Sequence, residues 1–93
     1  MIYKVIVSEK AQNQLFEAPP RIAGKLYYWA RTVGEIGLEN VRRIPGFHDE
    51  PLQGKRKGQR SIRLSLHYRA IYEVKKEDIL EFIRIEEVTK HEY

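Results

Sequence analysis

The stretch Gln53–Tyr72 reads QGKRKGQRSIRLSLHYRAIY and contains no acidic residue. It begins as a basic loop, and from Gln59 onward the alternation of apolar and polar residues predicts two short strands joined by a tight turn. Arg63 and Arg69 each fall within one of these strands. A guanidinium group presents a planar fork of donors that matches phosphate oxygens. Arginines mounted in a sheet therefore indicate a phosphate-binding site, and we interpret the stretch as the floor of a site that handles RNA.

The composition describes a folded protein with an uneven charge distribution. The chain has 93 residues, of which 42% are hydrophobic and 32% charged, and we expect one domain over residues 1–93. It has no cysteine, which excludes disulfides, thiolate metal sites and a cysteine nucleophile. The net charge is +4, but residues 51–72 carry six basic residues and no acid, whereas residues 73–93 carry seven acids and four basic residues. Such segregation predicts a surface that faces a polyanion. The alternative is a solvated basic loop without a partner.

The rest of the chain predicts an α+β fold. Ser8 is a good N-cap for a first helix, and the consecutive prolines Pro19 and Pro20 separate it from a second helix that we expect Gly34 to end. Trp29 lies on the apolar stripe of that second helix and is expected in the core. The predicted elements are a strand over 2–7, helices over 9–17 and 20–33, a short helix within 35–44, and strands over 59–66, 68–74 and 79–88. This order predicts an N-terminal strand and a helical hairpin packed on a C-terminal antiparallel β-meander. No apolar run reaches membrane-spanning length, and we expect a cytoplasmic protein without a membrane partner.

The residues around this stretch could cut RNA without a metal. Such a reaction needs a base for the ribose 2′-hydroxyl, an acid for the leaving 5′-oxygen and positive charge beside the phosphorus. Glu50 and His91 could act as the base, His91 and Tyr93 as the acid, and Arg63 and Arg69 could hold the phosphate. The competing interpretations are an idle chain terminus for His91 and Tyr93, and an ordinary ion pair with the basic loop for Glu50. The three histidines lack metal-ligand spacing, so we expect neither a metal site nor a cofactor; they are His48, His67 and His91.

Four segments together resemble the RelE/ParE superfamily of type II toxin–antitoxin toxins, and most closely the RelE, YoeB and HigB-type messenger-RNA interferases. They are Glu50-Pro51-Leu52, Gly58–Leu64, Tyr68–Tyr72 and Val88–Tyr93. The resemblance implies a RelE-like fold, metal-independent cleavage of messenger RNA in the ribosomal A site, and a cognate antitoxin protein. The partners it implies are therefore the antitoxin, the 70S ribosome and messenger RNA.

The resemblance also implies residue roles. Glu50 looks like the general base, Arg63 and Arg69 like the phosphate-stabilising arginines, and His91 like a general base or acid. Tyr93 resembles a terminal tyrosine that orients or stacks on the substrate. The cations that look like RNA backbone contacts are Lys55, Arg56, Lys57 and Arg60. One departure is that Glu92 separates His91 from Tyr93, which are adjacent in the branch that ends His-Tyr.

Two other functions remain open at this point. ParE-type members inhibit DNA gyrase and generally lack the clustered site residues, so the presence of Glu50, Arg63 and Arg69 with His91 argues against that function. A non-catalytic ribosome- or RNA-binding domain would need only the basic stretch. It would not explain an acid, Glu50, at the edge of that stretch.

Overall fold

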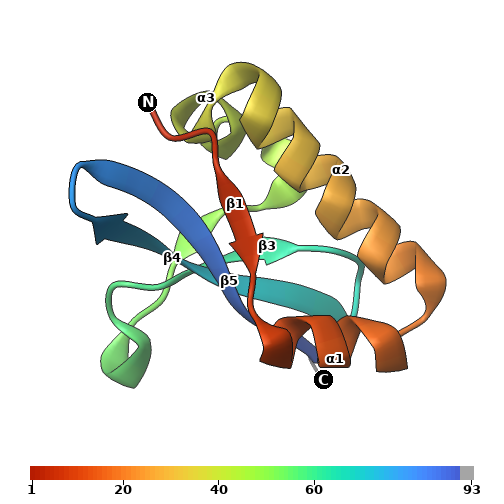
Figure 1. The fold of residues 1–93 in the computed structure, drawn as a ribbon. Helices are drawn as coiled ribbons and strands as arrows, with labels where there is room; N and C mark the ends of the chain where they lie inside the picture. Colours follow the sequence, from red (N-terminus) through yellow and green to blue (C-terminus); the bar gives the residue numbers. More distant parts are fainter. Residues whose placement is uncertain (91–93) are drawn as a thin grey trace.

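A computed structural model describes residues 1–90 and shows one mixed sheet with its helices on one side (Figure 1). The helices are α1 (Glu9–Glu17), α2 (Pro20–Ile36) and α3 (Leu38–Arg42), with single 3-10 turns η1 (Pro45–Phe47) and η2 (Gly54–Arg56). The strands are β1 (Val5–Val7), β2 (Glu50–Pro51), β3 (Arg60–Arg63), β4 (Tyr68–Glu77) and β5 (Leu80–Lys90). The expected α+β class, with a helical hairpin before an antiparallel meander, is confirmed.

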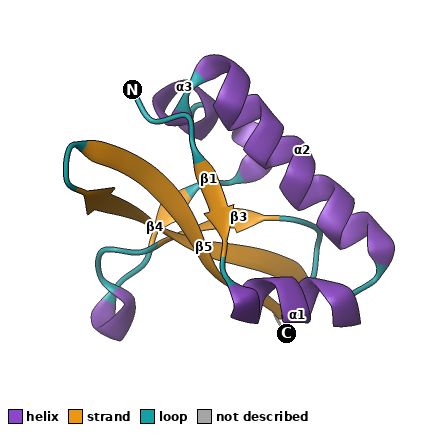
Figure 2. Cartoon of the chain, in the orientation of Figure 1, coloured by secondary structure: helices purple, strands orange, loops and turns teal. Residues whose placement is uncertain are grey.

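The sheet has the strand order β1-β5-β4-β3-β2. β5 pairs antiparallel with β4 and parallel with β1, so the N-terminal strand closes one edge while the short β2 forms the other (Figure 2). Residues that alternate along β3 and β4 point to opposite faces. Ile62 and Ala70, which are register partners, face the helices and are fully buried. The opposite face carries no α-helix in the described chain, and this open face is where Arg63 of β3 and its register partner Arg69 of β4 lie.

The core forms between this sheet and the two long helices. Ser8 caps α1 as expected, because its Oγ accepts a hydrogen bond from the Ala11 backbone N–H at 3.1 Å. Trp29 of α2 is fully buried as expected, and its ring centroid lies 5.3 Å from that of Tyr72 on β4. This contact ties α2 to the middle of the sheet. No helix in residues 1–90 is long and apolar enough to cross a membrane.

The expectation that Gly34 ends the second helix was wrong. The helix continues to Ile36, and the residue that ends it is Gly37, whose φ is 86°. Gly34 has ordinary helical surroundings, and the nearest heavy atom to a Cβ placed there would be the Tyr3 carbonyl oxygen at 3.9 Å. The residues after Gly34 and those after Gly37 are both compatible with a helix end. The local sequence therefore does not show which glycine ends the helix.

Three boundaries in the strands also differ from expectation. The first strand covers only Val5–Val7 and is shorter than predicted. The turn between β4 and β5 is Asp78-Ile79 alone, so β4 and β5 are both longer than predicted. The register partners Glu77 and Leu80 flank that turn, and Asp78 adopts a left-handed φ of 59°. The strand expected over 59–66 covers only Arg60–Arg63, and Leu66 lies exposed in the turn after it.

The corrected helix end gives a direct prediction. Gly37→Ala should lower the free energy of unfolding by about 1–2 kcal/mol, because alanine is strained at positive φ. Gly34→Ala should instead raise it by about 0.5–1 kcal/mol, because alanine favours helix and meets no close contact there. Urea unfolding of both variants measures this difference. A larger loss in Gly34→Ala than in Gly37→Ala would contradict the observed helix end.

Candidate active site

The open face of the sheet brings the two predicted phosphate-binding arginines together. Arg63 and Arg69 are register partners across β3 and β4, so their side chains leave the same face at adjacent positions. Ser61 lies on that face too, two residues before Arg63. Like charges directly opposite one another repel, so this pair needs counter-charge or an anion to be stable.

Glu50 of β2 supplies that counter-charge to one of the arginines. The Arg69 Nη1 group donates to the Glu50 carboxylate at 3.0 Å and to the Ser61 hydroxyl at 3.1 Å. The three side chains border an open cleft of about 390 Å³. Its lining residues are Glu50, Leu52, Arg56, Ser61, Arg69, Ile71 and Thr89. The cleft is therefore lined by two arginines, two hydroxyl residues and one acid, Glu50.

Arg63 has a different neighbour. Its Nη1 lies 3.5 Å from Nε2 of His48, a residue at the end of η1 whose backbone adopts a left-handed φ of 48°. The two arginines are thus flanked by His48 on one side and Glu50 on the other, both contributed by the segment that leads into β2.

Asp49, between these two residues, points the other way and is fully buried. Its carboxylate accepts from Arg60 Nε at 2.6 Å and from the Tyr72 hydroxyl at 2.5 Å, and its side chain is 0% exposed. Burial raises the pKa of Tyr72, and the hydrogen bond to Asp49 raises it further, so the hydroxyl stays protonated as a donor. Burial lowers the pKa of Arg60, but the hydrogen bond and charge of Asp49 outweigh it and the net pKa is raised. Arg42 completes the network by donating to the Tyr72 hydroxyl at 3.3 Å.

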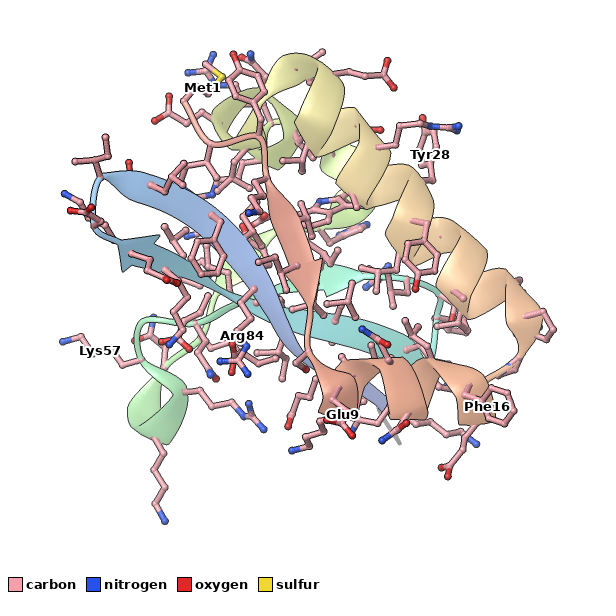
Figure 3. The ribbon with its side chains drawn as sticks, in the orientation of Figure 1. Met1, Glu9, Phe16, Tyr28, Lys57 and Arg84 are labelled. Atoms are coloured by element: carbon pink, nitrogen blue, oxygen red, sulfur yellow. The ribbon has the colours of Figure 1, made fainter. Side chains whose placement is uncertain are left out.

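The basic loop is fastened to the open face by a second acid, Glu87 of β5. Its carboxylate pairs with Arg56 of η2 and with Lys10 of α1, the latter at 2.9 Å. The hydrogen bond from Lys10 lowers the pKa of Glu87, burial opposes this, and Arg56 lowers the pKa further. The loop around η2 projects from the side of the sheet opposite the helices, and Figure 3 shows Lys57 extending from it into solvent. Lys55 is exposed on the same loop.

Comparison with known proteins identifies this architecture. No protein-family model matches the sequence, and no curated protein matches it either. Solved structures do. The YafQ toxin in the Escherichia coli DinJ–YafQ toxin–antitoxin complex aligns over 98% of this chain and 94% of its own with a TM-score of 0.71 and 20% identity. The YoeB/ParE toxin from Agrobacterium tumefaciens aligns over 96% and 99%, with a TM-score of 0.67 and 18% identity. The RelBE2 toxin–antitoxin complex from Mycobacterium tuberculosis aligns over 99% and 100%, with a TM-score of 0.67 and 22% identity.

The chain has the RelE/ParE toxin fold. The resemblance inferred from the sequence motifs is thereby confirmed at the level of the fold.

Within this RelE/ParE fold, the predicted site residues divide into four groups. Glu50, Arg63 and Arg69 meet on the open face. Arg56 and Arg60 are paired with Glu87 and Asp49, whereas Lys55 and Lys57 are exposed, and the role of all four as RNA contacts stays a prediction. His91 and Tyr93 lie outside the described residues, and their roles stay predictions. The last described strand ends beside the cleft, since Thr89 is the register partner of Arg69.

The sequence interpretation missed three residues that the RelE/ParE fold brings to the site. From the sequence, His48 was considered only as a metal ligand, and neither Ser61 nor Asp49 was singled out. The strand register could have revealed these residues, because residues at the start of an edge strand lie beside the next strand of the sheet. In residues 1–90 no three His, Asp or Glu side chains gather in a way that could hold a metal ion.

The Glu87 cluster gives a prediction about stability and pH. The folded pKa of Glu87 is below its unfolded value, so its contribution is present above about pH 4.5 and is lost as the pH falls through the folded pKa. Glu87→Gln should therefore lower the free energy of unfolding by about 1–2 kcal/mol at pH 7, since both cationic partners are partly exposed. The deficit should shrink toward zero near pH 3. Chemical denaturation at both pH values measures it.

Glu81→Gln, an exposed acid on the same strand, is the matched control and should change stability little at either pH. A Glu87→Gln deficit that is equal at pH 7 and pH 3 would mean that packing, and not charge, accounts for the effect.

Proposed function

We propose that this protein is the toxin of a type II toxin–antitoxin system and a metal-independent endoribonuclease that cuts messenger RNA in the ribosomal A site. The observation that carries the proposal is the adjacent pair Arg63 and Arg69 on the open face of a RelE/ParE fold, with the acid Glu50 beside them. The toxin assignment is supported by the solved neighbours, two of which are described as toxin–antitoxin complexes. Residues 1–93 would form a single toxin domain and would act in the cytoplasm, where ribosomes are.

The chemistry follows from the charges of the cleft. The ribose 2′-oxygen attacks the adjacent phosphorus, which yields a 2′,3′-cyclic phosphate and a 5′-hydroxyl. Arg69 and Arg63 stabilise the negative charge that develops on the phosphoryl oxygens, an effect worth several kcal/mol when the donors are already in place. Glu50 or His91 accepts the 2′-hydroxyl proton, and His91 or Tyr93 donates a proton to the leaving oxygen.

In the free protein the Glu50 carboxylate accepts a hydrogen bond from Arg69, as a phosphate oxygen would. An entering phosphate exchanges one anionic partner of Arg69 for another, so binding leaves no buried charge without a partner.

The exposed cations of the loop serve binding. Lys55 and Lys57 reach into solvent on the projecting loop, where they would contact the backbone of messenger or ribosomal RNA. Arg56 and Arg60 stay close to the same surface but are already paired with acids, so we assign them mainly to holding the loop and β3 in place. Phosphate contacts of this kind make RNA binding strongly dependent on salt.

A cognate antitoxin would be the second macromolecular partner. A basic open face offers charge complementarity to an acidic, partly disordered segment that orders on binding. Such a segment over the cleft would exclude RNA from Arg63 and Arg69.

The competing function is inhibition of DNA gyrase, since one solved neighbour is a YoeB/ParE toxin. The clustered Glu50, Arg69 and Ser61 favour the nuclease, because gyrase inhibition by a surface contact needs no carboxylate bonded to a cleft arginine. A ribosome-binding domain without catalysis would share the basic loop but make no cuts.

The test is expression of the toxin and of Arg69→Ala, with mapping of messenger-RNA 5′ ends. The unmodified toxin should arrest growth and produce discrete cuts within codons that carry 5′-hydroxyl ends. Arg69→Ala should lower the cleavage rate on programmed ribosomes by about 10²- to 10³-fold and relieve the arrest, because a placed donor to the transition state is lost. Arg21→Ala, an exposed arginine on α2, is the matched control and should behave like the unmodified toxin.

Two results would overturn the proposal. Growth arrest without RNA cuts but with DNA-damage signalling would support gyrase inhibition. Full cleavage activity in a folded Arg69→Ala variant would remove the cleft from the mechanism.

A further inference from the structure

The segment His48–Glu50 combines one buried contact with two contacts to the candidate site. Asp49 is held among Arg60 and Tyr72 on the helix-covered side of the sheet. Its neighbours His48 and Glu50 both contact arginines of the open face. Because Asp49 is held in place, the positions of His48 and Glu50 are also restricted.

The strand register places His48 in line with both arginines. Glu50 is the register partner of Ser61 in an antiparallel pair, so two residues earlier in one strand corresponds to two residues later in the other. That correspondence sets His48 beside Arg63, and the 3.5 Å separation between His48 Nε2 and Arg63 Nη1 agrees with it. Arg63 is opposite Arg69, which is opposite Thr89. One row across the open face therefore reads His48, Arg63, Arg69, Thr89, with strands about 4.8 Å apart.

The contact with Arg63 gives His48 Nε2 a hydrogen-bonding role. A guanidinium group can only donate, so Nε2 accepts with its lone pair in this contact. His48 is exposed, so this lone pair is accessible to a ligand that enters the open face. The backbone reaches this arrangement through a left-handed φ of 48°, which costs a non-glycine residue about 1–2 kcal/mol. The hydrogen bond from the His48 N–H to the Pro45 carbonyl at 3.0 Å and the anchoring of Asp49 offset that cost.

We propose that His48 is the general base of the reaction, which rests on the nuclease function proposed above. Its Nε2 takes the proton from the ribose 2′-hydroxyl as that oxygen forms its bond to phosphorus. The bond from phosphorus to the leaving 5′-oxygen breaks, and that oxygen takes a proton from the general acid of the reaction proposed above. Arg63 lies between His48 and Arg69 in this row. It holds the phosphoryl oxygens so that the neighbouring 2′-oxygen faces His48.

This assignment chooses His48 over the bases named in the reaction proposed above and gives Glu50 a different task. The Glu50 carboxylate accepts from Arg69, which also donates to Ser61, so Glu50 orients that guanidinium until a phosphate replaces the carboxylate. His48, in contrast, keeps an acceptor in contact with Arg63, a donor that phosphate would attract away. The two residues of one segment thus divide positioning from proton transfer.

The test is single-turnover cleavage of a short messenger RNA, with one mapped scissile linkage, on programmed ribosomes. His48→Ala should slow cleavage by about 10²- to 10⁴-fold, and added imidazole should restore at least tenfold of that loss, because the free base can take the proton in the vacated space. His48→Gln should be equally slow but should not respond to imidazole, since its side chain fills the space. Lys76→Ala, exposed and remote on β4, should cleave at the unmodified rate.

A second substrate separates base from acid. A messenger RNA with a 5′-bridging sulfur at the scissile linkage has a leaving group that needs no proton. His48→Ala should remain about as impaired on this substrate as on the oxygen linkage. Recovery on the sulfur linkage would make His48 the acid and overturn the proposal, as would full activity of His48→Ala or absence of imidazole rescue. If the unmodified protein cuts neither RNA, the nuclease function itself fails, and that outcome is distinct from loss of activity in His48→Ala alone.

Discussion

The structure depends on one buried carboxylate at the edge of the sheet. Asp49 accepts from Arg60 and from Tyr72 with its side chain wholly out of solvent, and the ring of Tyr72 in turn lies against Trp29 in the core. A buried charge is tolerated only when its hydrogen-bonding capacity is met, and removal of one partner leaves a large penalty. β2 has only two residues, too few to hold the edge by backbone pairing alone. Asp49 therefore fastens the segment from which the candidate site takes His48 and Glu50.

The two faces of the sheet then acquire separate properties. The covered face holds the apolar core. The open face carries the register partners Arg63 and Arg69, each in contact with a neighbour that a phosphate would replace. The register shift opposite Ile71 and Tyr72 serves both faces, because Glu86 of β5 is an extra residue between the partners of these two. With this extra residue, Ile85 faces the core while Glu87, two positions later, faces the open side of the sheet beside Ile71. Glu87, paired with Ile71, adds the link to the basic loop.

Much of the fold could be predicted from the sequence because its signals are local. Ser8 at a helix start, the prolines before α2 and the alternation around Ile62 each act over a few residues. The adjacency of Arg63 and Arg69 also followed, because a short turn between two strands leaves few registers. Gly34 and Gly37 could not be ranked, since the choice depends on the contacts of the N-terminal segment with Gly37.

The remainder of the site could not be predicted because it depends on pairings across long stretches of chain. Asp49 looked like a polar loop residue, and nothing local indicates that Tyr72, 23 positions later, donates to it. The pairings of Arg56 and Arg60 with acids have the same origin. Once β2 is known to pair with β3, the place of His48 beside Arg63 follows from counting residues.

The central claim is that Asp49 holds the edge segment against the sheet, and amide hydrogen exchange tests it most directly. The Leu52 N–H bonds to the Gln59 carbonyl at 2.9 Å across the β2–β3 edge, and the Ile83 N–H bonds to the Lys4 carbonyl at 2.8 Å at the far side of the sheet. In Asp49→Ala the Leu52 amide should exchange at least tenfold faster relative to Ile83 than in the unmodified protein, a local loss of about 1.4 kcal/mol. If the two amides accelerate equally, or if Leu52 is unchanged, the edge is held by other contacts and the account is wrong.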